Sequence, residues 1–159
     1  MCTCSSGWCS CRGGRAKGFY RQDAKSAKKI LRAEPDKRLD DLARVVVDAA
    51  LEVHRELGPG LVEGVYEEAL GLELRMRDIP FVRQHPVSVS YKGHLVGEGR
   101  VDLLVGNALI VELKAVEKLL PVHKAQVISY LKARGSILGL LIIFNERLLR
   151  DGIQRVVVS

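Results

Sequence analysis

The chain has 159 residues, and 47% of them are hydrophobic, which is enough for one folded domain with an apolar core. No stretch approaches the ~20 consecutive apolar residues that a membrane-spanning helix needs, so the composition argues against a membrane protein. The first residues also lack the apolar region of a secretory signal, and we expect the protein to be cytoplasmic.

The formal net charge of +6 is unevenly distributed. Residues 1–38 contain 10 Lys and Arg against 3 Asp and Glu, a net charge of +7, whereas residues 39–159 contain 15 against 16, a net charge of −1. We therefore predict a basic, flexible N-terminal extension at residues 1–38 and one folded domain at residues 39–159. The extension could hold phosphates in a salt-sensitive, non-specific way.

All four cysteines lie in the first eleven residues, so no disulfide can hold the domain together. The two C-x-C pairs could bind zinc through four thiolates and so regulate the domain, or they could belong to an unstructured leader. The C-x-C spacing is tighter than that of most structural zinc sites, which favours the leader. The cysteines are Cys2, Cys4, Cys9 and Cys11.

Two helices are predicted at the start of the domain. The domain opens at Leu39, and an apolar stripe at helical spacing runs over Leu42–Leu57, with Asp40 or Asp41 as the N-terminal cap and Gly58-Pro59-Gly60 as the stop. His54 lies just off this stripe. It is either a metal or phosphate ligand or a histidine at the boundary of the core, and its position favours the second interpretation.

The second predicted helix covers Leu61–Arg77 and begins with two notable residues. Glu63 falls in the first turn, where the helix dipole favours a carboxylate, and Tyr66 follows three residues later on the same face. Glu63 is either an acidic site residue or a simple helix-start charge. Tyr66 is either a supporting site residue or part of the core, and the residues alone leave both pairs of alternatives open.

The rest of the domain is predicted to contain five strands and one helix. Alternating or continuous apolar runs, bounded by turns, indicate the strands. The helix begins at a proline and stops at a glycine. The eight apolar residues of the fourth strand suit a strand that is buried on both faces. The predicted strands are Phe81–Tyr91, Leu95–Val105, Ala108–Lys114, Ile137–Phe144 and Ile153–Val158, and the helix runs from Pro121 to Gly135.

The third strand and the one before it carry Asp102, Glu112 and Lys114 among Val, Leu and Ile. Charges in a buried sheet are costly unless they are paired or hold a metal. Glu112 and Lys114 are two residues apart and therefore point to the same face. Two carboxylates can hold a hard divalent cation, and a neighbouring ammonium can orient a water beside it.

The loop between these strands decides whether Asp102 joins Glu112. A two-residue loop, Gly106-Asn107, would put the two side chains on opposite faces. A three-residue loop, Val105-Gly106-Asn107, would make them diagonal neighbours on one face. A metal site therefore requires an odd-numbered loop or a bulge.

The predicted third helix carries Gln126 and Tyr130 four residues apart on one face, with His123 one turn earlier. They are either site residues or the half-buried polar residues of an ordinary amphipathic helix.

Three motifs occur together in the domain: Asp102 followed by Glu112-Leu113-Lys114; Gly60-Leu61-Val62-Glu63-Gly64-Val65-Tyr66; and Gln126-x-x-x-Tyr130. The first resembles the D…(D/E)-x-K signature of the PD-(D/E)XK nuclease superfamily, although Val101 rather than proline precedes the aspartate. The second resembles the motif of the GxxExxY family within it, and the third is similar to a motif of the RecB-like branch. The resemblance covers roughly residues 39–158.

This resemblance implies an α/β, restriction-endonuclease-like αβββαβ core, with a mixed central sheet flanked by helices. It implies that Asp102 and Glu112 bind Mg²⁺ or Mn²⁺ and that Lys114 acts on the attacking water, so these three are the predicted catalytic residues. Glu63 would add a metal ligand, and Gln126, Tyr130 and Tyr66 would support the site or contact substrate.

The implied function is a metal-dependent nuclease, a hydrolase of phosphodiester bonds, with DNA as the expected partner. The alternative is a catalytically silent module on the same fold that binds nucleic acid or protein. The nearly neutral domain favours the alternative, because it offers few cations for a long duplex.

Overall fold

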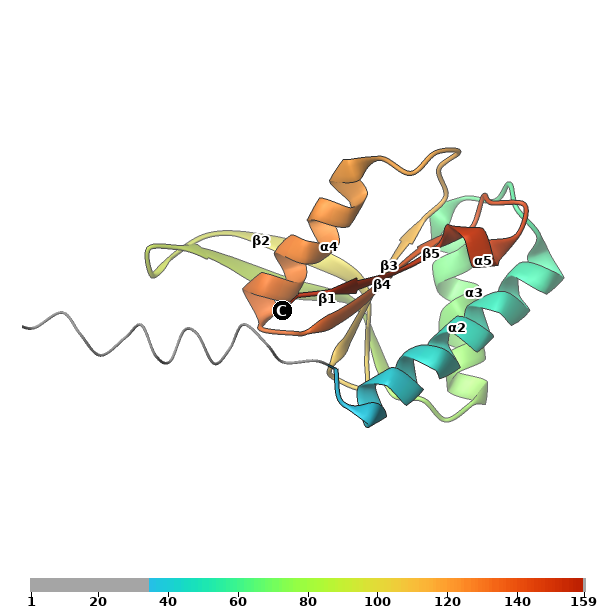
Figure 1. Ribbon diagram of the computed structural model, residues 1–159, viewed down its shortest axis with the longest axis horizontal. Coiled ribbons are helices and arrows are strands. Elements are labelled where there is room, and N and C mark those ends of the chain that lie inside the picture. Colours follow the sequence, from blue (N-terminus) through green and yellow to red (C-terminus); the bar gives the residue numbers. More distant parts are fainter. Residues whose placement is uncertain (1–34, 159) are drawn as a thin grey trace, which may run out of the picture.

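The computed structural model describes residues 35–158 as a mixed α/β fold (Figure 1). Its five-stranded sheet has the order β1-β2-β3-β4-β5, with β3 and β4 parallel and all other neighbours antiparallel. The predicted α/β class and the αβββαβ order from α3 to β4 are confirmed. The elements are α2 (Lys37–Leu57), α3 (Glu63–Met76), β1 (Phe81–Tyr91), β2 (His94–Val105), β3 (Leu109–Lys114), α4 (Pro121–Arg134), β4 (Leu138–Ile143), α5 (Leu149–Gly152) and β5 (Ile153–Val157).

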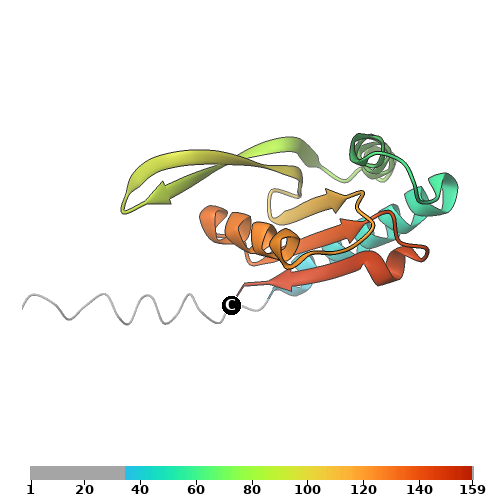
Figure 2. The ribbon, with the colours of Figure 1, turned by 90° about the horizontal axis from the view of Figure 1, so that it is seen from above.

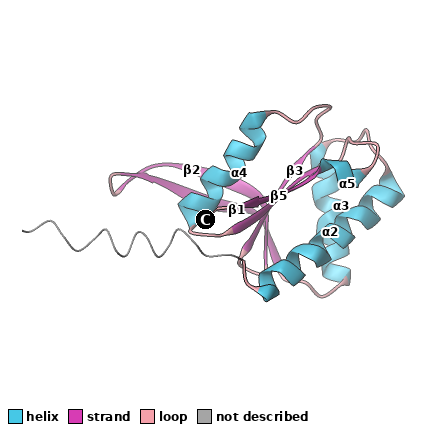
Figure 3. Cartoon of the chain, viewed as in Figure 1, coloured by secondary structure: helices cyan, strands magenta, loops and turns pink. Residues whose placement is uncertain are grey.

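Helices cover the two faces of the sheet unequally. Helices α2, α3 and α5 lie on one face and α4 lies on the other (Figures 1 and 3). The larger apolar cluster joins α2 and α3 to one face of β2, β3 and β4. A smaller cluster packs Val127 and Leu131 of α4 against the opposite face. Alternation along the strands therefore sends neighbouring residues into different clusters, as expected of a sheet buried on both faces.

Helix α2 begins at Lys37, several residues before the start that a cap at Asp40 or Asp41 would give. Asp36 is the N-terminal cap, and its side chain accepts a hydrogen bond from the Leu39 N–H at 2.8 Å. The expectation that Asp40 or Asp41 caps this helix was therefore wrong. Asp36 takes this role because it lies just before the first turn, with the extended backbone that a cap requires. The predicted end is confirmed, since Gly58 has a φ of 67°.

Helix α4 and strand β4 lie where the sequence places them. Helix α4 begins at Pro121 and ends before Gly135, whose left-handed backbone closes the last turn. Every residue of β4 is buried, which confirms a strand covered on both faces. Within the described sheet, strand β5 pairs with β4 alone and forms the predicted edge.

Strands β1 and β2 form a long hairpin that projects beyond the body of the domain (Figure 2). Its outer part, residues 86–100, is mostly exposed. The pairing register shifts between Val89 and Ser90, so the hairpin contains a bulge near its tip.

Two further results bear on the predicted location and extension. Among residues 35–158, no helix is long and apolar enough to cross a membrane. The four cysteines and nearly all of the predicted basic extension lie outside the described residues, so the predictions made for them stay predictions.

Candidate active site

The β2–β3 turn sets the geometry of the site. Val105 pairs with Leu109 and Leu104 pairs with Ile110, so three residues, Gly106 to Ala108, separate the paired strands. The loop is odd-numbered, as a shared face requires, but it lies one residue later than the predicted loop. Both Gly106 and Asn107 have a positive φ, which closes the turn. Continued by one pair, this register sets Asp102 directly opposite Glu112 rather than diagonal to it.

Asp102 is 9% exposed and both of its carboxylate oxygens are engaged. Oδ2 accepts a hydrogen bond from the Leu113 N–H at 2.8 Å, and Oδ1 accepts one from the Gln84 side-chain amide at 3.4 Å. Burial raises the pKa of Asp102 above its ordinary value, although the Leu113 hydrogen bond and the Lys114 charge act to lower it. The two strands on either side of Asp102 therefore hold its carboxylate in place.

Glu112 is 2% exposed and carries the largest perturbation of the site. Oε1 contacts the Lys114 ammonium at 3.2 Å, while Oε2 is buried and has no hydrogen-bond partner among the described residues. Burial, and then the nearby Asp102 charge, raise the pKa of Glu112 to about 7. A buried carboxylate oxygen without a donor is costly, so it needs a cation or a proton.

Lys114 is the last residue of β3 and connects the site to α3. Its Nζ lies 3.2 Å from Glu112 Oε1 and 3.5 Å from Glu63 Oε1, and it donates to the Leu113 carbonyl at 2.8 Å. Burial alone would lower the pKa of Lys114, but the charges of Glu112, Asp102 and Glu63 together raise it. The ammonium is therefore charged and fixed against the carboxylates.

Glu63 and Tyr66 both lie at the start of α3, but their side chains contact different parts of the domain. Glu63 is partly exposed and faces Lys114. Tyr66 is fully buried: its hydroxyl donates to the Gly58 carbonyl at 2.8 Å and accepts from the Leu61 N–H at 3.0 Å. Its ring stacks on Phe144 at 4.3 Å. These contacts brace the corner between α2 and α3.

The remaining candidates lie on other elements. On α4, the Gln126 side-chain amide donates to the Tyr130 hydroxyl at 3.2 Å, and the Tyr130 ring lies against the backbone of Gly99 on β2. His54 donates from Nε2 to the Glu146 carbonyl at 2.9 Å. This contact suits a histidine at the boundary of the core, as its position favoured.

Two further residues, Gln84 and Glu67, contact the site and were not among the predicted candidates. Glu67 is 7% exposed and accepts hydrogen bonds from Gln84 and Arg83, both at 2.9 Å. Its spacing of four residues from Glu63 places it one turn further along the same helix face, and this signal could have found it. Gln84 carries no such signal, because its role depends on a backbone conformation that tertiary contacts impose.

The donor set fits a hard divalent cation. Asp102 and Glu112 bring together two buried carboxylates, and the unpartnered Glu112 Oε2 is an oxygen ligand of the kind that Mg²⁺ and Mn²⁺ prefer. Within residues 35–158, no three His, Cys, Asp or Glu side chains are grouped closely enough to hold a metal ion. The protein would thus supply two carboxylates directly, and water or substrate would complete the coordination.

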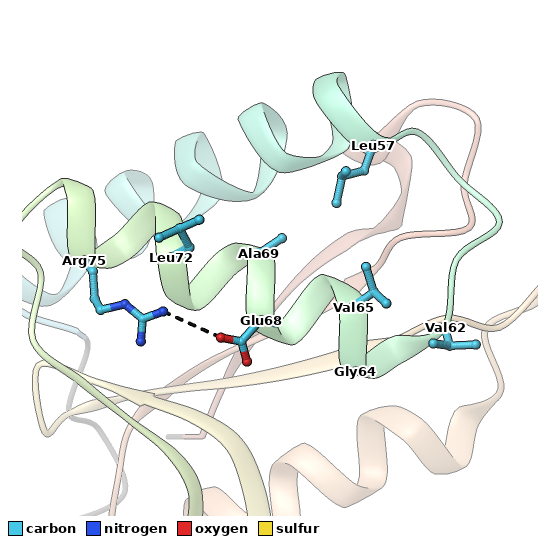
Figure 4. Close-up of a pocket in the computed structure, with 8 residues that line it drawn as sticks. All are labelled: Leu57, Val62, Gly64, Val65, Glu68, Ala69, Leu72 and Arg75. Carbon is cyan, nitrogen blue, oxygen red and sulfur yellow. Dashed lines mark ion pairs between the residues drawn. The ribbon is translucent and has the colours of Figure 1, made fainter.

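An open hollow on the surface of the described residues lies away from these side chains. It has a volume of about 660 Å³ and is lined mainly by apolar side chains of α3 and the end of α2, with an ion pair between Glu68 and Arg75 at its side (Figure 4). None of Asp102, Glu112 and Lys114 lines it. Paired buried carboxylates with perturbed pKa values are a stronger sign of chemistry than an open apolar hollow, so we place the candidate site at the acidic pair.

Comparison with known proteins gives one family match. The family model of the PD-(D/E)XK nuclease superfamily matches residues 40–156. No significant match was found among curated proteins. A solved structure described as the crystal structure of SSO0001 aligns over 89% of this chain and 79% of its own, with 17% sequence identity and a TM-score of 0.39.

The family match extends from α2 into β5 and so includes every element that forms the site. The buried charges on β2 and β3 are costly in a purely structural sheet. With its family model matched over residues 40–156, this chain belongs to the PD-(D/E)XK nuclease superfamily.

Proposed function

We propose that the protein is a divalent-metal-dependent nuclease that hydrolyses phosphodiester bonds in DNA. The observation that carries the proposal is the acidic pair: two carboxylates that are 9% and 2% exposed, with one buried oxygen that no donor within residues 35–158 reaches. Such an arrangement is unfavourable for the metal-free protein and becomes favourable when a cation binds. The proposal includes a cytoplasmic location, and membership of the GxxExxY family and the RecB-like branch.

Asp102 and Glu112 would hold Mg²⁺ or Mn²⁺, and Glu63 would assist through water. When bound, the cation supplies Lewis acidity toward a phosphoryl oxygen and increases the acidity of a coordinated water. The Leu113 carbonyl would complete the protein ligands, but it accepts a hydrogen bond from Lys114 in this structure. A carbonyl oxygen has two lone pairs, so it can accept this hydrogen bond and still be a ligand.

Lys114 would orient the attacking water and stabilise negative charge that develops on the scissile phosphate. Its Nζ is held by three oxygens of Glu112, Glu63 and Leu113, so it is oriented before substrate arrives. An ammonium fixed in advance stabilises developing charge without reorganisation at the moment of reaction. The raised pKa of Lys114 keeps it charged at neutral pH, so it would act as an electrostatic group rather than as a base.

Three further residues support this site in the proposal. Gln126 and Tyr130 of α4 would support the site or contact substrate. Their hydrogen bond fixes one side chain against the other. Tyr66 would act at a distance, by holding the corner that sets the start of α3 and hence Glu63.

A cleavage assay tests the proposal. Labelled single-stranded DNA, duplex DNA and RNA would be incubated with Mg²⁺, Mn²⁺ or a chelator. We expect cleavage of DNA with metal only, and a loss of at least ~10³-fold in Glu112→Gln, because that change removes a charged metal ligand. Lys114→Met should lose at least ~10²-fold. Glu98→Gln, an exposed carboxylate on β2, is the matched control and should retain full activity.

The second candidate function is the silent binding module. It is favoured by the contacts of Lys114, which already pairs with two carboxylates, and by the near-neutral charge of residues 39–159. If the full chain binds DNA but cleaves none of the three substrates with either metal, this candidate replaces the nuclease.

A further inference from the structure

Gln84 has an unusual backbone conformation for its position. Four described residues other than glycine have a positive φ, and three of them, Asp78, Lys92 and Asn107, lie in turns. Gln84 lies inside β1 with a φ of 48°. A left-handed residue within a strand is costly, so the surrounding contacts must impose it, and such residues cluster at functional sites.

The kink at Gln84 changes which way the neighbouring side chains point. Consecutive residues of a regular strand face opposite sides of the sheet. Arg83 and Gln84 are consecutive, yet both donate hydrogen bonds to Glu67 of α3, one to each carboxylate oxygen. In the pairing between β1 and β2, Arg83 lies opposite Leu103 and His85 lies opposite Val101. The pair that would lie between them, Gln84 with Asp102, is missing from the regular pairing.

The packing of the hairpin changes face at the same step. On one side of it, Phe81 and Leu103 pack with the α2–α3 cluster. On the other side, Val87 and Val101 pack with the α4 cluster. Leu103 and Val101 are two residues apart and would share a face in a regular strand. The irregularity therefore involves both strands and is centred on Asp102.

The Gln84 amide connects this kink to the acidic pair. Its Nε2 donates to Glu67 Oε2 at 2.9 Å and to Asp102 Oδ1 at 3.4 Å. Glu67 is nearly buried and is also held by Arg83, so it provides a fixed anchor for the amide. The Leu113 N–H holds the other oxygen of Asp102 at 2.8 Å. With both oxygens engaged, the Asp102 carboxylate has one orientation.

We propose that Gln84 is a positioning residue: its left-handed backbone and its bridging amide orient the Asp102 carboxylate beside Glu112 for cation binding. Glu67 of α3, which Arg83 of β1 also holds, anchors this bridge. The inference rests on the proposed function, since it concerns the same cation site. Groups that orient a metal ligand typically change metal affinity by 10- to 100-fold when they are removed.

The first arm of the test needs no metal. The side-chain amide resonances of Gln84 would be recorded by ¹⁵N–¹H NMR in the full chain, in Glu67→Gln, in Asp102→Asn and in the control Glu68→Gln. We expect the first two substitutions to shift the Gln84 amide signals. Glu68 contacts Arg83 but not Gln84, so the control should leave them in place. Signals that move in neither Glu67→Gln nor Asp102→Asn would overturn the proposal, because the amide would then bridge nothing.

The second arm measures Mn²⁺ affinity in Gln84→Gly. Glycine accepts a positive φ without strain, so this change removes the amide and preserves the kink. Lys92→Gly, at a φ of 50° in the hairpin turn, is the matched control for glycine at a left-handed position. We expect a 10- to 100-fold weaker affinity in Gln84→Gly, no change in the control, and no loss of thermal stability in either.

The two arms separate this inference from the proposed function. Unchanged Mn²⁺ affinity in a folded Gln84→Gly would overturn the positioning role and leave the nuclease proposal standing. Absence of Mn²⁺ binding by the unsubstituted chain would instead overturn the proposed function. The amide signals would then decide alone whether Gln84 holds Asp102.

Discussion

Strands β3 and β4 lie side by side in the centre of the sheet, run parallel, and are almost equally buried, yet their compositions differ. Every residue of β4 is apolar, whereas β3 carries Glu112 and Lys114. The register pairs Glu112 with Leu141 and Lys114 with Ile143, so each charged residue of β3 lies beside an apolar residue of β4. Apolar side chains satisfy burial at this level in β4, so the buried charges of β3, which are costly, call for a separate explanation.

The largest effect should come from giving β4 the chemistry of β3. Leu141→Glu would bury a carboxylate among the apolar side chains on the α4 side of the sheet, with no cation placed to pair with it. We expect a loss of about 3–5 kcal/mol in the free energy of unfolding at neutral pH, because an unpaired buried charge costs that much. Urea unfolding measures it. A loss below about 1 kcal/mol would mean that this level of the sheet tolerates charge, and the contrast with β3 would lose its meaning.

The converse change should stabilise the protein. Glu112→Leu removes the unpartnered Oε2 and restores an apolar side chain beside Leu141. The change also ends the repulsion between Glu112 and Asp102, while Lys114 keeps its contacts with Glu63 and the Leu113 carbonyl. Because no buried charge is left without a partner, we expect the gain of about 1–4 kcal/mol that replacing buried charges by apolar groups can give, for the metal-free protein. Thermal unfolding in the presence of a chelator checks the gain. A large destabilisation would show that Glu112 stabilises the fold itself. Cation binding would then not be needed to explain why Glu112 is buried.

The pH dependence of stability should distinguish Glu112 from an ordinary carboxylate. Its pKa is about 7 in the folded chain and near the ordinary value of 4.5 when unfolded. The unfolded state therefore releases the proton first as pH rises. The free energy of unfolding falls between about pH 4.5 and 7 and stays at the lower value above that window.

Relative to Glu112→Gln, which cannot ionise, the unsubstituted chain should lose about 1–3 kcal/mol of stability between pH 5 and pH 8 without metal. Urea unfolding of both proteins at both pH values measures the difference. A constant difference across the window would contradict a raised pKa of Glu112.

Lys114→Met should have the smallest effect on stability. The change removes the ammonium that pairs with Glu112 and Glu63, but it also relieves the burial of the lysine. Because these terms oppose each other, we expect a loss of only about 1 kcal/mol at neutral pH. The loss should be smaller at about pH 5, where Glu112 binds a proton instead. Unfolding at the two pH values tests this order.

The contrast between these strands also explains what the sequence could and could not predict. The apolar run of β4 and the charges of β3 are both visible in the sequence, and they led directly to the buried strand and to the candidate residues. The register was predicted only as a requirement, an odd-numbered loop. The choice of Gly106 to Ala108 depends on two consecutive residues with positive φ, which the sequence permits but does not demand.

Residues whose role comes from tertiary contact were beyond the sequence patterns. Gln84 sits in a run that predicts a regular strand, and only the packing of β1 against α3 explains its left-handed backbone. Glu67 could have been found from its helical spacing to Glu63. The cap of α2 was missed by a few residues, because Asp36, Asp40 and Asp41 are all suitable caps and local pattern alone does not choose among them.

The most direct test of the acidic pair as a metal site is calorimetric titration of the full chain with Mn²⁺, at about pH 8 so that Glu112 is ionised, beside the variants Glu112→Gln and Glu98→Gln. We expect saturable binding that Glu112→Gln abolishes and that Glu98→Gln leaves unchanged. Absence of binding, or binding that Glu112→Gln leaves intact, would contradict the assignment of Asp102 and Glu112 as the metal ligands.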